Sequence, residues 1–386
     1  MSTSAESTSH AKIRVGLIGT GGIAVYKHLP ALKAHQDRVE VVAAADVSAD
    51  RLNTVADEWQ IPGRYPDAES LLAAEKPDLL VVCTPPVAHR DVVIAGLQAG
   101  AWVWCEKPPM LSLAEYDEVA GYEGAAGPYA SYVFQHRFGS AAQRLRRHVQ
   151  EGTLGRPLVS VCHTLWFRTH EYYEVPWRGK WETEGGGPTM GHGIHQMDLL
   201  FEILGDWSEV TARAEVLDRD VETEDVSLAM VKFASGAVGS VINSVISPRE
   251  SSYLRFDFTD ATVEVEHVYG YDNTSWRWTP APHRAEDTQV VERWVPEENI
   301  PSSHIQQLGE LLDSMERGQR PRASGDDGRR VLEFIAALYE SAETGRTVTR
   351  HDLARQGTYY TGMHNPAHVY RLQRPTSPAV QGATHG

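Results

Sequence analysis

The sequence predicts an α/β protein of two domains: a doubly wound parallel sheet, then an α+β domain with a large, mostly antiparallel open sheet. Up to about residue 135, short apolar runs alternate with helical patterns, as expected for a parallel sheet covered by helices on both faces. After residue 155, strand-like runs follow one another with few helices between them. The length of 386 residues is sufficient for two such domains.

In the first domain, the elements are expected in strict alternation. Ser48 and Ser112 stand where helix N-caps are expected, and Glu115 follows Ser112 at capping-box spacing. The predicted strands are residues 13–18, 39–45, 78–83, 102–105 and 129–134. The predicted helices are residues 21–34, 48–58 and 89–99, and one that starts at residue 112.

In the second domain, apolar and polar residues alternate, which is typical of a sheet with one solvated face. Its predicted strands are residues 158–166, 209–217, 227–233, 237–246, 253–258 and 262–268. Helices are predicted at residues 189–204, 302–317 and 326–344. The expected division is a disordered lead (1–11), the first domain (12–135), the second domain (136–372) and a flexible tail (373–386). We leave open that the C-terminal helix packs back on the first domain.

Composition and charge exclude several classes of partner. Asp and Glu number 52 against 36 Lys and Arg, and the formal charge of −16 argues against nucleic acid. No apolar run is long enough to span a membrane, and residues 1–10 lack the apolar core of a secretion signal. The three cysteines (Cys83, Cys105 and Cys162) fit no metal-binding spacing. We therefore expect a cytoplasmic protein with buried structural thiols.

A glycine motif follows the first predicted strand. The residues Gly19, Gly21 and Ala24 have the spacing G-x-G-x-x-A, with Gly22 and Ile23 inside it. In a strand–helix–strand unit this motif indicates a Rossmann dinucleotide-binding domain. Gly19 permits the tight turn, Gly21 lets a pyrophosphate approach the backbone, and Ala24 permits close helix–strand packing. The N–H groups at the start of the helix would then face the phosphates.

Asp46 ends the second predicted strand, 25 residues after Gly21. A carboxylate at this place accepts hydrogen bonds from the adenosine ribose and repels a 2′-phosphate, which favours NAD over NADP. Arg51 keeps NADP open, because its guanidinium could contact such a phosphate. The alternative role for Asp46 is a turn or capping residue.

Several further segments, in order along the chain, resemble the Gfo/Idh/MocA oxidoreductases, the family of glucose–fructose oxidoreductase and inositol dehydrogenase. The resemblance covers about residues 12 to 350. It is carried by residues 15–24, Thr84-Pro85-Pro86 with His89, Glu106-Lys107-Pro108, residues 135–138, residues 151–155, Gly185-Gly186-Gly187 followed by His195 and Asp198, and residues 324–329 leading into 337–341.

The resemblance implies roles for particular residues. Thr84, Pro85, His89 and Gln135 would lie along the cofactor, and Glu106 would help to hold its nicotinamide side. Lys107 would be the catalytic lysine, and His195 would stand across the pocket as a proton donor or acceptor. A lysine in a partly dry pocket beside an oxidised nicotinamide should have a lowered pKa, and can then act as a base or donate to a developing alkoxide.

The sequence departs from the family pattern at Gly191. The family has an Asp four residues before the His, where both would share one helix face. Three explanations remain open: Lys107 and His195 suffice and Gly191 makes room for a different substrate; His192 supplies the missing group; or the reaction differs, with transient oxidation during glycosidic bond cleavage. A metal on His192, His195 and Asp198 is disfavoured because their angular drift on a helix is large, so no metal is expected and Asp198 is expected to be structural.

Substrate recognition is expected from an aromatic and basic segment, residues 166–181. Aromatic faces stack on sugar rings, and Arg or Lys can bind hydroxyls or a carboxylate. Trp177, Arg178 and Lys180 are the predicted substrate-binding residues of this segment, together with Lys107, His192 and His195. The alternative is that these aromatic residues pack a core or an oligomer contact.

These observations lead to a functional hypothesis with two alternatives. The leading hypothesis is an NAD(P)-dependent dehydrogenase acting on a secondary alcohol or ketone of a sugar, glycoside or cyclitol, with Lys107 and His195 as acid and base. The alternatives are an NAD-dependent glycosidase or lyase that works through a keto sugar, and a non-catalytic cofactor-binding sensor. The open sheet needs cover, so a homo-oligomer, dimer or tetramer, is expected through it.

Overall fold

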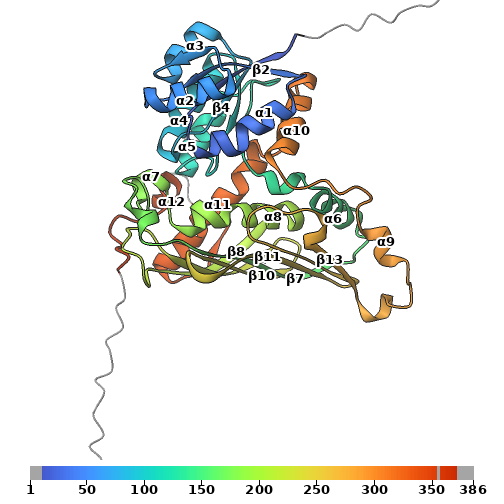
Figure 1. Cartoon of the computed structure of the whole chain (residues 1–386). Coiled ribbons are helices and arrows are strands. Elements are labelled where there is room, and N and C mark those ends of the chain that lie inside the picture. Colours follow the sequence, from blue (N-terminus) through green and yellow to red (C-terminus); the bar gives the residue numbers. More distant parts are fainter. Residues whose placement is uncertain (1–10, 354–356, 372–386) are drawn as a thin grey trace, which may run out of the picture.

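The computed structural model describes residues 11–353 and 357–371, and the expected lead and tail lie almost entirely outside these ranges. The chain forms an upper and a lower lobe, each built on its own sheet (Figure 1). The predicted fold class is confirmed: a Rossmann sheet is followed by a mostly antiparallel sheet.

The first sheet is fully parallel, with the strand order β3-β2-β1-β4-β5-β6. This is the doubly wound order, in which the direction of winding reverses between β1 and β4 and leaves a crevice at their carboxyl ends. Its strands are β1 (Ile13–Ile18), β2 (Val39–Ala45), β3 (Gly63–Tyr65), β4 (Leu79–Val82), β5 (Trp102–Cys105) and β6 (Ala130–Tyr132). Its helices are α1 (Leu29–Ala34), α2 (Ala49–Trp59), α3 (Ala68–Glu75), α4 (His89–Gln98) and α5 (Leu113–Ala120).

Local signals explain where these elements begin. Ser48 accepts a hydrogen bond from the backbone N–H of Arg51, and Ser112 accepts one from Glu115, as expected for N-caps. The predicted helix 21–34 is interrupted by a π-helical segment, Ala24–His28, before α1. Strand β3 and helix α3 were not predicted, because three residues with a central arginine give no strand pattern.

The second sheet has eight strands in the order β13-β12-β11-β7-β10-β9-β8-β14, and only the β7–β10 pair is parallel. The predicted strand 237–246 ends early, because Val245 separates β10 from a longer β11. The strands are β7 (Pro157–Phe167), β8 (Trp207–Glu215), β9 (Val226–Phe233), β10 (Val238–Ser244), β11 (Ile246–Phe258), β12 (Ala261–His267), β13 (Trp276–Pro280) and β14 (Val348–Thr349).

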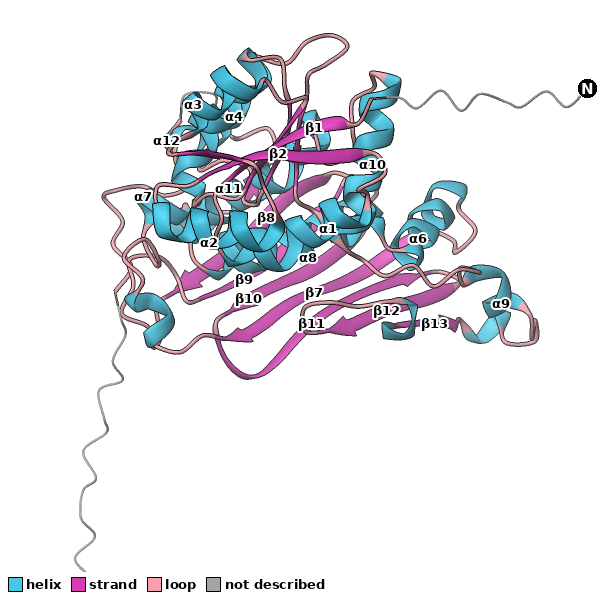
Figure 2. Ribbon diagram, turned by 45° about the horizontal axis from the view of Figure 1, so that its top comes forward, coloured by secondary structure: helices cyan, strands magenta, loops and turns pink. Residues whose placement is uncertain are grey.

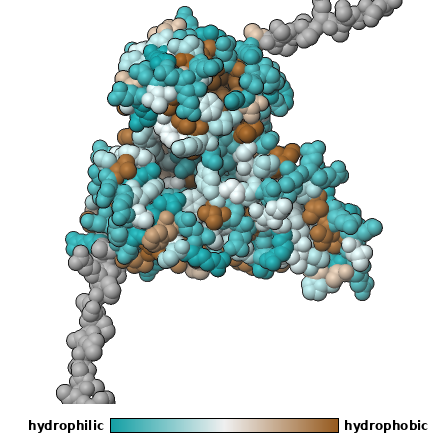
Figure 3. All heavy atoms as spheres, viewed as in Figure 1, coloured by the Kyte–Doolittle hydropathy of each residue, from teal (hydrophilic) through white to brown (hydrophobic). Residues whose placement is uncertain are grey.

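Helices cover one face of this sheet, and the opposite face is open (Figures 1 and 2). The helices of the second half are α6 (Ser140–Glu151), α7 (Trp181–Glu184), α8 (Ile194–Leu204), α9 (Val290–Trp294), α10 (His304–Arg317), α11 (Gly325–Thr344) and α12 (Thr358–Thr361). The open face carries exposed apolar side chains in its middle strands, namely Val159, Leu228, Met230 and Val238. In Figure 3, hydrophobic residues come to the surface along the lower edge of this lobe.

The two lobes are joined by helices as well as by the chain. Leu308, Leu311 and Leu312 of α10 are fully buried in one core with residues of β1 and β2. Helix α11 contacts α5 and β8. Arg137 also ties the second half together, because its buried guanidinium donates to Asp198 of α8 at 2.7 Å and also pairs with Asp327 of α11. The predicted structural role of Asp198 matches this contact.

Candidate active site

A cavity of about 830 Å³ lies between the lobes and reaches from the glycine loop to α8. The carboxyl ends of β2, β4 and β5 open onto it from above. Two groups of residues meet there. From the first lobe come Gly19, Gly21, Gly22, Ile23, Asp46, Arg51, Thr84, Pro85, Glu106 and Lys107; from the second come Trp166, Arg168, Tyr172, Trp177, Arg178, Glu184, Gly191, His192, His195 and Tyr269.

The glycine loop fits a dinucleotide pyrophosphate. Gly19 has φ +88°, and a Cβ there would lie 2.7 Å from the Cys83 carbonyl oxygen, so that only glycine is accommodated. Around Gly21, no described heavy atom lies within 4 Å of the place of a Cβ, so the backbone is open to the cavity. Ala24 is buried behind the loop, as close packing of the helix on the strand requires.

Asp46 follows β2 and lines the cavity, and both of its carboxylate oxygens accept hydrogen bonds. It accepts from the Thr20 N–H at 2.8 Å, the Ser48 N–H at 2.8 Å, and Arg51 Nη2 at 2.6 Å. Burial opposes ionisation, but the hydrogen bonds from Arg51, Ser48 and Thr20 outweigh it and lower the pKa of Asp46 to about 2. The Arg51 side chain remains half exposed beside it.

Of four further predicted cofactor contacts, two line the cavity and two do not. Thr84 and Pro85 line the cavity, whereas His89 is fully buried and does not. The two ring nitrogens of His89 contact the Pro108 and Thr84 carbonyl oxygens at 2.9 and 3.0 Å, so that His89 holds two loops together. Gln135 is also buried and outside the cavity lining.

Lys107 follows β5 and crosses to the other lobe, where its Nζ donates to the Gly191 carbonyl oxygen at 2.9 Å. Burial lowers the pKa of Lys107, while Glu106 opposes that shift. His192 and His195 lie on the facing wall, and burial followed by the Lys107 charge holds the pKa of each well below its usual range. Both imidazoles are therefore neutral near pH 7. In the part of the chain that the structure describes, Nδ1 of each is buried without a hydrogen-bond partner.

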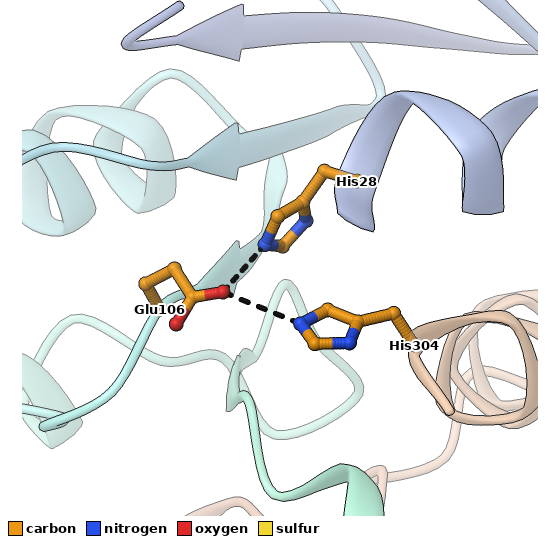
Figure 4. A group of neighbouring side chains, drawn as sticks. All are labelled: His28, Glu106 and His304. Atoms are coloured by element: carbon orange, nitrogen blue, oxygen red, sulfur yellow. Dashed lines mark hydrogen bonds and ion pairs between the residues drawn. The ribbon is translucent and has the colours of Figure 1, made fainter. Parts of the chain in front are cut away.

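Glu106 forms a buried cluster with two histidines that sequence reasoning did not connect (Figure 4). Its Oε1 accepts from His28 Nε2 at 2.8 Å and from His304 Nε2 at 3.4 Å. Burial opposes ionisation of Glu106, but these hydrogen bonds outweigh it and hold the pKa of that carboxyl well below its usual range. The cluster therefore keeps a carboxylate charged beside Lys107.

The same cluster has the composition of a metal site, since its ligand atoms lie within 4.8 Å of one another. Two hydrogen bonds to a shared carboxylate oxygen account for the arrangement. Metal-bound histidines normally donate through their second ring nitrogen, but His28 Nδ1 is buried with no partner among the described residues. The expectation of no metal remains a prediction.

The structure shows the surroundings of Gly191, where the sequence departs from the family pattern. Gly191 lies in a π-helical segment, Thr189–Gly193, directly before α8. No described heavy atom lies within 4 Å of the place that its Cβ would take. The missing carboxylate therefore leaves open space in the cavity wall, and the backbone carbonyl of Gly191 binds Lys107 instead.

The aromatic and basic segment reaches the cavity only in part. Trp177 and Arg178 line it, as do Trp166, Arg168 and Tyr172. Lys180 is exposed and precedes α7, so it is not among the lining residues. Glu184, which sequence reasoning missed, lies beside Arg178 with 3.5 Å between Oε1 and Nη1. Its only sequence signal was its position just before the three glycines.

Comparisons with known proteins agree with this arrangement. Residues 13–130 match the model of the oxidoreductase family with an NAD-binding Rossmann fold, and residues 142–265 match the GFO/IDH/MocA C-terminal domain. D-glucoside 3-dehydrogenase of Escherichia coli is 26% identical, over 87% of this chain and 97% of its own. D-xylose 1-dehydrogenase (NADP+) 2 of Haloferax volcanii is 29% identical, over 86% and 98%.

A solved structure shares the whole architecture. The WlbA dehydrogenase of Chromobacterium violaceum, in complex with NADH and UDP-GlcNAcA, superposes with a TM-score of 0.77. It is 27% identical, and the match covers 88% of this chain and 96% of that one. Over 88% of this chain, the fold is therefore shared with a dehydrogenase that was solved with NADH.

Proposed function

Because this chain belongs to the GFO/IDH/MocA oxidoreductase family, we propose that it oxidises a secondary alcohol of a sugar, glycoside or cyclitol, or reduces the corresponding ketone. The observation that carries the proposal is that Lys107 Nζ lies in the same cavity as the glycine loop, His192 and His195. Bound nicotinamide dinucleotide supplies the hydride acceptor. Curated relatives that act on glucosides and on xylose support a carbohydrate substrate.

In this proposal the residues divide the proton chemistry. Neutral Lys107 takes the hydroxyl proton of the substrate, and its lowered pKa favours the neutral form needed for this. His195 orients the hydroxyl from the opposite wall, and its neutral ring can both donate and accept. The charged Glu106 would help to hold a bound nicotinamide and to stabilise its positive charge.

We propose NAD as the preferred cofactor. When Arg51 releases one of its two hydrogen bonds, the ionised Asp46 would accept the ribose hydroxyls, and its charge would repel a 2′-phosphate. Arg51 already pairs with Asp46, which limits its availability to a phosphate.

We further propose a homo-oligomer formed through the open face of the C-terminal sheet, in the cytoplasm. Support for the oligomer comes from the exposed apolar side chains on neighbouring strands, with Met230 68% exposed. Support for a reducing compartment comes from three buried cysteines without disulfides. Among the described residues, no helix has the length and apolar character to cross a membrane. Light scattering of Met230→Asp checks the oligomer, which should then dissociate.

A turnover screen tests the proposed reaction. The purified chain is incubated with NAD+ or NADP+ and sugars, glycosides, sugar acids and inositols, with absorbance at the nicotinamide band and sugar products followed together. Reduced nicotinamide with one substrate class supports the dehydrogenase. A changed sugar without net reduction would instead support transient oxidation during bond cleavage, and no change in either channel would support a sensor.

A further inference from the structure

The reaction end of the cavity carries an alternating stack of aromatic rings and guanidinium groups. Arg168 lies 4.8 Å from the centre of the Trp166 ring and 5.5 Å from that of Tyr172. Arg178 lies 3.9 Å from the centre of the Tyr172 ring and 4.3 Å from that of Trp177. We call these five residues the arginine–aromatic ladder. All five line the cavity that also holds Lys107 and His192.

The ladder holds Arg178 with its N–H edge available. Tyr172 and Trp177 cannot occupy the same space, so they cover different parts of the guanidinium face. Arg178 Nη1 donates to the Tyr172 hydroxyl and faces Glu184. A stacked, oriented guanidinium presents its remaining donors in the fixed fork that matches a carboxylate. Such preorganisation is more than the recognition of isolated hydroxyls requires.

Two guanidinium groups, Arg168 and Arg178, line this end. Arg168 Nη1 pairs with Glu250 at 3.0 Å, whereas Arg178 Nη1 lies 3.5 Å from Glu184. Burial raises the pKa of Glu184, which weakens its compensation of Arg178. The oxidised nicotinamide would add a further positive charge. A neutral substrate would leave the charge of Arg178 only partly compensated in a partly dry cavity, where such charge is costly.

The cavity wall at Gly191 also lacks a negative charge. The carboxylate that the family carries there is missing, the place of its side chain is open space, and the Gly191 carbonyl binds Lys107. We infer that the substrate of this enzyme is an anionic sugar whose own carboxylate is bound by the arginine–aromatic ladder. This inference rests on the proposed dehydrogenase function and specifies its substrate class.

The test compares matched pairs of substrates: methyl β-D-glucuronide with methyl β-D-glucoside, and D-galacturonate with D-galactose. In the wild-type protein, kcat/KM should be higher for the acid of at least one pair by about tenfold or more, as expected for a charge-assisted contact. Arg178→Gln should reduce that ratio at least tenfold, and Arg178→Lys should reduce it less. NADH fluorescence and circular dichroism check that each variant is folded and binds cofactor.

Gly191 offers a second, independent variant. Gly191→Asp puts a carboxylate into open space and should lower the acid-to-neutral ratio about tenfold by like-charge repulsion. Gly191→Asn has the same size without the charge and should change the ratio much less. If both variants change it equally, size and not charge is responsible, and the inference is wrong.

The outcomes separate this inference from the proposed function. Two results together would overturn the anionic substrate: neutral sugars are turned over with equal or better kcat/KM, and the acid-to-neutral ratio of kcat/KM does not respond to Arg178→Gln. The proposed dehydrogenase function would remain valid. If nothing is turned over, glucuronate and galacturonate are titrated calorimetrically into the NADH-loaded protein. Saturable binding that weakens about tenfold in Arg178→Gln supports the carboxylate site, while the absence of binding of either acid overturns it.

Discussion

The two ends of the cavity are built on different principles. At the end proposed for adenosine, Asp46 is held in place by neighbours within its own domain before any cofactor arrives. At the reaction end, His192 and His195 line the cavity, and a buried nitrogen of each has no partner within the described chain. Since buried polar groups are normally paired, we expect the contacts of this end to be completed when a substrate binds. The cofactor end is preformed, and the reaction end is left to be completed.

The strongest test of this contrast is Lys107→Met. Removing the base should lower kcat about a thousandfold, because proton removal then depends on water. NADH affinity, measured by fluorescence, should change little, since the adenosine end is intact. Lys107→Arg keeps the charge but cannot act as a neutral base, and should be nearly as slow. A loss of NADH binding matching the loss of kcat would show that the two ends are not independent.

The histidine pair gives the next largest expected effect. His195 is 5% exposed and interacts with both Lys107 and Glu106, so His195→Asn should lower kcat about a hundredfold. His192 packs edge-on against Trp166, with 5.3 Å between ring centres, so His192→Asn should act mainly on KM. Steady-state kinetics of the two variants measure kcat and KM separately. A loss of kcat in His192→Asn and a change of KM in His195→Asn would assign the acid–base role to His192.

At the adenosine end, Asp46→Ser should release Arg51 and remove the charge that repels a 2′-phosphate. The ratio of kcat/KM with NAD+ to that with NADP+ should then fall about tenfold or more toward NADP+. Asp46→Asn loses the charge but keeps the shape, and should shift the ratio less. An unchanged ratio in Asp46→Ser would mean that this carboxylate does not select the cofactor.

The smallest expected effect is the change of the oxidation rate with pH. Below its pKa Lys107 is protonated and cannot act as a base, so alcohol oxidation should rise up to tenfold per pH unit and level off above that pKa. Burial places the pKa of Lys107 below 10.5, so the plateau should begin below that pH. Ketone reduction needs the ammonium and should fall over the same range. The rising limb should be absent in Lys107→Met, and its persistence there would point to another group.

Much of the fold could be predicted because it rests on local patterns. The apolar runs of β1, β2 and β5 contain at most one charged residue each, and the predicted bounds match the structure at both ends. Strands β13 and β14 were missed, because β14 has two residues and β13 alternates over only four residues before its proline. A local sequence pattern predicts most strands and helices. It fails for a short strand that exists only because it pairs with a neighbouring strand.

Local spacing alone predicts the glycine loop and Asp46 of the site, whereas Lys107 and His195 were predicted from the family resemblance. The glycine loop and Asp46 follow from spacing, because they belong to one continuous strand–helix–strand unit. The pairing of His28 and His304 with Glu106 joins residues 78 and 198 positions away, and no local pattern reveals it. Lys180 lies three residues after Trp177 yet is exposed and outside the cavity lining, because the chain turns at Gly179 (φ +70°) just before α7. Membership of an aromatic segment did not determine which side chains face inward.

The packing of α10 against the first lobe has a mechanical consequence. The chain passes from β6 into the second lobe and returns with α10 in the first-lobe core, so that two separated segments tie the lobes together. A wide rotation of one lobe against the other would have to break that core. We therefore expect the spacing between the two sheets to stay fixed while small molecules enter and leave the cavity.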